Sequence, residues 1–565
     1  MTFPYDALDR ADSTTPENLL KIPGPDQHPV LIARHMLLLA NFLQHLHPNL
    51  YHEMESLPES PRAIMERLAH LASSHVTTND RLLGSIEGLE CIIIETSYQA
   101  NMGNLRRSWV LCRRAISIAQ LMGLNKSNNQ AQYKVLDPET MCHPHLMWFR
   151  IVALDRQLSL MLGLPQASPD KSMASEAVLA NDTPIGRLER IHCVIASRIL
   201  ERNESHYEDD TLTRTLDLEL QVAAKSLPSK WWLVPKLAAS TDTRAQFWDA
   251  RRLFAQIVHY NLLNQLHLPY MLRSSSTQNK HEYSRITCIN ASRDILSRFT
   301  TLRNFNGISY SCRIIDFLTL MAAMTLLLAH LDSHHAGAEN LLSHQYYSDR
   351  AMIEQVQENM EEVNSLYSDA LSAQSADLLR RLLTIEVDPA EGTGDKTVSV
   401  QEAGTPPDND AAVSVHIPYF GIIKIAREGI SQELATTNEL HQMGAQNSSP
   451  EPTEPSRDSD CLRLANGGRR SHASASLPTP TYSSVEEHAT AVSIPDVGEN
   501  PFGSHYPPYL HDSLADPLWQ YAEEPDLAAG GEDWAFQGVD MAFFENLMRS
   551  TRNETNEDAE WSRVQ

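Results

Sequence analysis

Cysteine is scarce in this chain, and no group of cysteines has the spacing that binds a metal ion. The 565 residues include seven cysteines, and none forms a Cys-x-x-Cys pair of the kind that holds zinc in compact modules. Their number is odd, and the first residues, Met1 to Pro4, begin no signal-peptide pattern. We therefore expect free thiols and a reducing intracellular compartment.

Basic charge is also scarce, and its distribution is uneven. The chain has 72 Asp and Glu against 46 Lys and Arg, a net charge of −26. From Asp388 onward there are 30 acidic and 10 basic residues, a net of −20, so the first 387 residues carry only −6. Direct DNA binding needs a basic footprint. The balance argues against charge-driven DNA binding by this chain and predicts a nearly neutral globular part with an acidic tail.

The sequence lacks any arrangement of residues typical of catalysis or metal binding. It has no glycine-rich phosphate loop, and its histidine groups are interrupted by Pro48 and Pro144, with no carboxylate or cysteine at ligand spacing. Asp155 and Arg156 are adjacent, and such neighbours do not share a helix face. We expect each to bond a different neighbour near a helix interface. The prediction is a protein without enzymatic activity and without a cofactor or metal in this sequence.

What the sequence does contain is helical periodicity from His28 to about Glu386. Ile86, Leu89 and Ile93 lie on one stripe of a helix expected over 85–100. A second helix is expected over 106–123, with Gly123 as its left-handed cap. Other helices are expected at 30–46, 188–203, 212–226, 243–265, 283–303, 311–331 and 349–383. No stretch shows sustained strand-like alternation. The predicted class is all-α, an irregular array of helical hairpins rather than a regular repeat, followed by a long disordered acidic tail.

One apolar run, Ile314 to Leu331, is long enough to cross a bilayer as a helix. It contains Asp316 and His330, and Arg313 precedes it. A helix buried on nearly all sides of a helical domain explains it better. We expect no membrane association.

Composition divides the chain into six segments. Residues 1–27 are rich in proline and aspartate and predict a flexible leader, and 28–386 form the helical domain. Residues 387–431 are expected to be a loop with a short closing element near the apolar His416–Ile423. Residues 432–511 are dominated by Ser, Thr, Pro and Asn and predict a disordered linker. An acidic-aromatic segment, 512–548, and a disordered C-terminus, 549–565, follow.

The acidic-aromatic segment predicts activation of transcription. Residues 512–548 hold nine acidic residues, six aromatics and no Lys or Arg. Acidic neighbours keep aromatic side chains solvated and available to an apolar groove on a partner, and 540–548 can fold there as a helix. The alternative is a tail that only keeps the chain soluble. The candidate activation contacts are Trp519, Trp534, Phe536, Phe543, Phe544 and Leu547.

Several short motifs follow one another in a fixed order. In that order they resemble the helical regulatory region, or middle homology region, of fungal binuclear zinc-cluster transcription factors. The motifs are Ile86-Glu87-Gly88-Leu89, Ala115 and Ala119 before Gly123-Leu124, Trp148 with Asp155-Arg156 before Gly163-Leu164-Pro165, and Leu266-His267-Leu268-Pro269-Tyr270.

The resemblance implies a transcriptional regulator, an activator, in a fungal nucleus, controlling a metabolic or secondary-metabolite biosynthetic gene cluster. Its expected partners are transcription coactivators, with homo- or heterodimerisation left open. The family's six-cysteine zinc cluster is absent from this sequence, so DNA is expected to be reached through a partner or through a missing module, which would hold the only zinc. A helical domain with a small-molecule-sensing groove would govern exposure of the tail. The alternative is a helical scaffold or adaptor without a direct transcription role.

Overall fold

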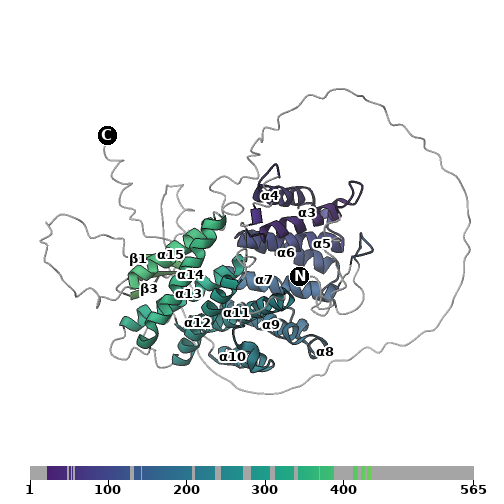
Figure 1. The fold of residues 1–565 in the computed structure, drawn as a ribbon. Helices are drawn as coiled ribbons and strands as arrows, with labels where there is room; N and C mark the ends of the chain where they lie inside the picture. The colour runs from purple at the N-terminus through teal and green to yellow at the C-terminus, as the bar shows by residue number, and fades with distance from the viewer. Residues whose placement is uncertain are drawn as a thin grey trace, which may run out of the picture. The chain divides into compact units, whose positions relative to one another are not determined.

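The described part of the chain is a set of packed helices followed by three short strands (Figure 1). The computed structural model describes residues 22–47, 50, 51, 54, 57–126, 133–140, 143–205, 210–235, 243–271, 281–305, 312–335, 342–367, 369–386, 412–417, 421–426 and 429–433. These ranges cover most of the helical domain expected from the sequence.

Two helical pairs begin the described chain. They comprise α3 (Pro29–Gln44), α4 (Pro61–Ala72), α5 (Ile86–Asn101) and α6 (Leu105–Leu121), with a π-helical turn at Ser73–Thr77 and a 3-10 turn at Asp80–Leu82. Ser85 begins α5 because its Oγ accepts a hydrogen bond from the Gly88 amide at 3.0 Å. Gly103, with φ of 86°, turns the chain into α6, and Gly123, with φ of 75°, follows it. The left-handed glycine predicted after the second helix is confirmed.

The middle of the chain contains three helices that together line a cavity. The elements are α7 (Pro144–Leu162), a 3-10 turn at Ser172–Ala174, α8 (Glu176–Ala180), α9 (Pro184–Ser205), α10 (Asp210–Lys225), a 3-10 turn at Ser229–Trp232 and α11 (Thr243–Met271). Helix α7 packs on α6 and α9, and α9 packs in turn on α10 and α11.

The last helices surround a central apolar helix. They are α12 (Glu282–Phe305), α13 (Arg313–His335), a 3-10 turn at Ser343–Gln345, α14 (Tyr346–Tyr367) and α15 (Ala370–Glu386). Helix α13 packs against α11, α12, α14 and α15. Within its apolar stretch, Arg313–Ser333, 89% of the most hydrophobic window is buried. The expectation of a core helix over Ile314–Leu331 is therefore confirmed, and its side chains belong to the largest apolar cluster, which joins α5–α7 to α11–α15.

Two helix boundaries differ from the sequence prediction. The single helix expected over 349–383 is two, α14 and α15, because Asp369 begins a new helix by accepting hydrogen bonds from the amide (2.9 Å) and hydroxyl (2.5 Å) of Ser372. The helix expected over 243–265 is also longer, since α11 continues through Pro269 to Met271.

Arg202 of α9 explains how α11 accommodates its proline. Pro269 has no N–H to donate to the carbonyl of Gln265, four residues earlier. The Arg202 guanidinium supplies donors instead, to Gln265 O at 3.3 Å and to Leu266 O at 2.6 Å. Burial lowers the pKa of Arg202 to about 10, so it remains charged at neutral pH. A neighbouring helix thus supplies the donor that the proline removes.

A small antiparallel sheet lies where the sequence predicts a loop with a short closing element. Its strands β1 (Ala412–Ile417), β2 (Gly421–Ala426) and β3 (Gly429–Glu433) pair in the order β1-β2-β3. Val415 lies opposite Ile423, and Ile425 lies opposite Ile430. Strand β1 contacts α15 and β3 contacts α13. The all-α class is confirmed for the helical domain, and the three strands are only five or six residues long, too short for the sustained alternation that the sequence lacks.

Candidate functional site

The residues predicted to contact coactivators lie outside the described part of the chain. Trp519, Trp534, Phe536, Phe543, Phe544 and Leu547 all belong to the segment after residue 433, where the description ends. Among the residues that the structure describes, no group of three His, Cys, Asp or Glu side chains is placed to hold a metal ion.

The motif containing Trp148, Asp155 and Arg156 forms structural contacts along α7, with Trp148 near its start and the other two in its middle. The Trp148 indole donates to Asp170 Oδ2 at 2.9 Å, while Asp155 accepts from the Ala167 amide at 2.8 Å and pairs with Arg113 of α6 at 3.0 Å. Burial raises the pKa of the Asp155 carboxyl, against the opposing effects of the Ala167 amide and Arg113. As predicted, Asp155 and Arg156 bond different neighbours.

Arg156 is fully buried and bonds main-chain oxygens from two segments. Its guanidinium donates to Ser168 O at 3.0 Å and Asp170 O at 2.5 Å, in the segment that follows α7. It also donates to Cys193 O of α9 at 3.0 Å. Gly163, with φ of 67°, starts this segment in the left-handed region. The motif therefore joins α7, its closing turn and α9.

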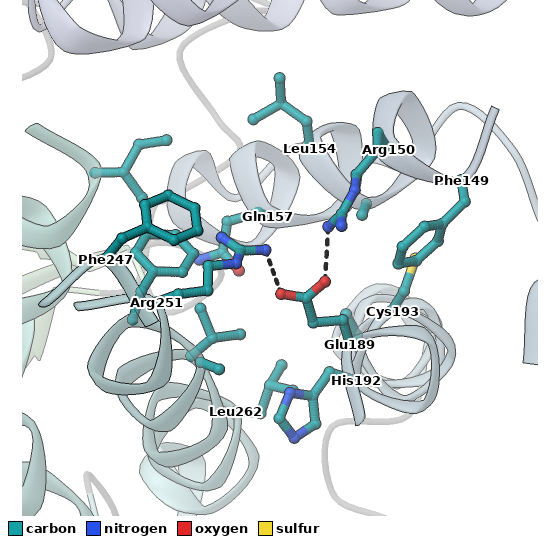
Figure 2. Close-up of a pocket in the computed structure, with 16 residues that line it drawn as sticks. Phe149, Arg150, Leu154, Gln157, Glu189, His192, Cys193, Phe247, Arg251 and Leu262 are labelled. Atoms are coloured by element: carbon teal, nitrogen blue, oxygen red, sulfur yellow. Dashed lines mark hydrogen bonds and ion pairs between the residues drawn. The ribbon is translucent and has the colours of Figure 1, made fainter. Parts of the chain in front are cut away.

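Next to this junction, α7, α9 and α11 line a cavity of about 380 Å³ (Figure 2), to whose lining α13 contributes Ile314. That volume lies in the range of small-molecule sites. Most of the lining is apolar or aromatic, and it includes Phe149 and Leu154 of α7 and Phe247 and Phe254 of α11. The cavity walls come from helices that are far apart in sequence.

Three charged side chains form an ion-pair bridge across the cavity lining. Arg150 of α7 donates to Glu189 Oε2 of α9 at 2.7 Å, and Arg251 of α11 donates to Glu189 Oε1. Figure 2 shows Glu189 between the two guanidinium groups. Two arginines and one glutamate give these lining residues one net positive charge.

The carboxamide of Gln157 also reaches the cavity. It lies on the cavity side of α7, one turn beyond Ala153 (Figure 2). Its Nε2 is buried and makes no hydrogen bond with the described residues. A buried amide nitrogen without an acceptor is uncommon, since it loses hydration without recovering the bond.

A buried histidine pair lies beside the cavity, at the contact of α9 with α11. His192, which lines the cavity, has its Nε2 3.0 Å from Nδ1 of His259. Burial lowers the pKa of His192 to about 3 and lowers that of His259 as well. Both rings are therefore neutral at physiological pH and add no charge to the lining.

The cavity has the chemistry of a binding site rather than that of a catalytic one. Its cysteine, Cys193, is buried, and burial raises the pKa of its thiol, so it stays protonated. The sequence analysis includes the motif of Trp148 with Asp155-Arg156 and the helix over 243–265, but it gave no indication of Glu189, Gln157 or Arg251 as site residues. The signal that could have found these three was a set of polar side chains on otherwise apolar helix faces.

Comparison with known proteins identifies the family. The chain is 53% identical to the dehydrocurvularin biosynthesis regulator of Alternaria cinerariae, over 98% of its own length and 77% of the relative's. It is 54% identical to the dehydrocurvularin biosynthesis regulator of Aspergillus terreus, over 97% and 76%. It is 31% identical to transcription factor sdnS of Sordaria araneosa, over 94% and 70%.

No protein-family model and no solved structure matches the chain. The relatives, however, are similar along nearly the whole of it, and at 53% identity they support the regulatory role expected from the ordered motifs over that of an enzyme or a scaffold. The chain is a transcriptional regulator, and it belongs to the family of fungal transcription factors that includes the dehydrocurvularin biosynthesis regulators.

Proposed function

We propose that this chain is a nuclear transcriptional activator of a gene cluster for the biosynthesis of a secondary metabolite. The observation that carries the proposal is the 53% identity, over 98% of the chain, to a protein named as the regulator of dehydrocurvularin biosynthesis. The genes are nuclear, so the protein acts in the nucleus.

The helical domain takes the part of the middle homology region of zinc-cluster factors. Its support is the position of the motifs on helices: Ile86-Glu87-Gly88-Leu89 begins α5, and Gly163-Leu164-Pro165 closes α7. DNA is reached through a partner protein or through a zinc-cluster module outside this sequence, and zinc belongs to that module alone. Dimerisation, with a second copy or with a related factor, would double the contacts with DNA.

The acidic-aromatic segment recruits transcription coactivators. Its support is composition: nine acidic residues and six aromatics over 512–548, without a basic residue. The aromatic and aliphatic side chains Phe543, Phe544 and Leu547 enter an apolar groove on the coactivator, and the acidic residues keep them solvated until then. The helical domain governs whether this segment is exposed.

A tethered reporter tests the activation role. Residues 432–565 are fused to an unrelated DNA-binding domain, and the variant Phe543→Ala with Phe544→Ala is compared with the parent segment. Loss of reporter transcription is expected, because both aromatic contacts are removed. Phe502→Ala with Tyr506→Ala, in the linker, is the matched control and should activate like the parent. Equal activity of the Phe543/Phe544 variant and the parent would remove the activation role.

A further inference from the structure

We propose that the cavity between α7, α9 and α11 binds a small molecule with an apolar, ring-containing body and one carboxylate or phenolate group. The acid group would lie against Gln157 and the two arginines, Arg150 and Arg251. The inference rests on the proposed function in one respect, since this molecule would be the effector that the helical domain senses.

The size and lining of the cavity define the body of the ligand. A volume of about 380 Å³ accommodates a molecule of a few fused or linked rings. Phe149, Phe247 and Phe254 provide aromatic faces, and Leu154 and Leu262 provide aliphatic ones. Burying an apolar ring system against these side chains supplies most of the binding free energy.

The polar groups define the head of the ligand. Gln157 Nε2 is a buried donor without an acceptor among the described residues, so an oxygen acceptor on the ligand would satisfy it. Arg150 and Arg251 outnumber Glu189 in the lining, which favours an anion over a cation. Charge-assisted hydrogen bonds from guanidinium groups are stronger than neutral ones, particularly where water is excluded.

The position of the cavity explains how a bound ligand would affect the rest of the helical domain. A bound molecule would contact three helices at once, together with Ile314 at the start of the central helix α13. Each of these helices packs on further elements of the core. Binding to the folded state alone stabilises it by mass action, so occupancy would stiffen this part of the domain.

The test uses the full chain and two probes with the same ring body. One probe is 2-naphthoate, which carries a carboxylate, and the other is 2-naphthylmethylammonium, which carries a cation. Isothermal titration is expected to show saturable binding of 2-naphthoate, with the cation weaker by about tenfold or more because it meets a positive lining. Equal affinity for the two probes, or no saturable binding of 2-naphthoate up to its solubility limit, would overturn the proposal.

Two variants tie binding to the cavity. Ala153→Phe fills the cavity, and Gln157→Glu replaces the amide donor by a negative charge. Each variant is expected to lower the affinity for 2-naphthoate by about tenfold or more. The matched controls are Ala351→Phe on α14 and Gln120→Glu on α6, both at exposed positions, and they should bind like the parent. Thermal unfolding checks that every variant folds. If Ala153→Phe does not fold, Gln157→Glu provides the test. An unchanged affinity of that variant for 2-naphthoate would contradict the proposed head-group site.

The binding assay and the reporter assay fail independently. Absence of 2-naphthoate binding would not affect activation by the tethered segment, because residues 432–565 do not include the cavity. Loss of activation leaves the titration unchanged, because the titration does not depend on transcription. If the chain binds 2-naphthoate but residues 432–565 do not activate the reporter, the ligand proposal stands and the activation role is removed.

Discussion

The histidines at the contact of α9 and α11 show how burial decides the charge of single residues. His192 Nε2 and His259 Nδ1 lie 3.0 Å apart, so one ring donates a hydrogen bond that the other accepts, and burial lowers the pKa of both rings. Trp232 packs against His259, with ring centroids 4.7 Å apart. Because both rings are neutral in the folded state, the unfolded chain binds protons at mildly acidic pH that the folded chain does not bind.

Stability is therefore expected to fall as the pH drops below about 6.5, the ordinary pKa of histidine. His192, with a folded pKa of about 3, takes up its proton only in the unfolded state between these values. Between pH 7.5 and 5.5 this costs about 1.4 kcal/mol of unfolding free energy for His192 alone.

Urea unfolding at the two pH values measures the difference, with His192→Gln as the variant. Glutamine keeps a hydrogen-bonding side chain but does not titrate, so its loss of stability between pH 7.5 and 5.5 should be smaller by about that amount. His70→Gln, at an exposed position on α4, is the control and should follow the parent. The same pH dependence in His192→Gln as in the parent would show that the ring is charged in the folded state.

At the scale of elements, Arg156 holds the turn that closes α7. Its guanidinium satisfies the carbonyls of Ser168 and Asp170, and the neighbouring Asp155 accepts from the Ala167 amide. A loop this close to the core would otherwise carry buried polar groups without partners. One arginine therefore fixes the path of the chain between α7 and the 3-10 turn at Ser172–Ala174.

Replacement of that arginine should be strongly destabilising. Arg156→Ala leaves three carbonyl oxygens without this donor, two at the buried residues Ser168 and Cys193 and one at the half-buried Asp170. At about 1 kcal/mol or more for each, the loss of unfolding free energy is expected to be about 3 kcal/mol. Arg81→Ala, at an exposed position in a 3-10 turn, should change stability by about 0.5 kcal/mol or less. Urea unfolding of both variants provides the comparison, and similar stabilities would contradict the anchoring role.

Elements whose cause lies in their own sequence could be predicted. The helices expected over 85–100 and 106–123 occur as α5 and α6, because apolar spacing, a serine cap and a glycine after the helix are all local. The continuation of α11 through Pro269 could not be predicted from local sequence, because Arg202 on another helix supplies the donor that Pro269 lacks. The break before α15 was predictable in principle, because Asp369 is an ordinary cap residue.

The candidate site illustrates the same limit at the scale of the whole molecule. Glu189 is 39 residues from Arg150 and 62 from Arg251, so no local pattern brings the three together. Their contact depends on how α7, α9 and α11 pack. The ordered motifs did predict a fungal transcription factor, and those that begin α5 and close α7 lie at a helix start and a turn. They carried no information about the cavity, which lies between helices rather than within one.

The whole chain has two tasks, which the proposed function assigns to different segments. Finding promoters requires a partner or a zinc-cluster module, and stimulating transcription requires 512–548. The net charge follows this division, since the acidic excess of −20 lies after residue 387. An acidic segment is repelled by DNA phosphates and is therefore poorly suited to promoter binding.

The 565-residue chain, tagged at its own locus, is therefore expected to occupy promoters of a biosynthetic gene cluster. Chromatin immunoprecipitation with sequencing measures occupancy, and transcript levels of the bound genes measure output. Deletion of 512–548 should leave the occupied sites unchanged and abolish the transcripts, while deletion of the same length within the linker, 455–491, should preserve both. Loss of occupancy on deletion of 512–548 would mean that this segment also engages the DNA-reading partner. Absence of occupancy by the intact chain would mean that promoter recognition needs a module outside this sequence, which a fusion to a zinc-cluster domain would then restore.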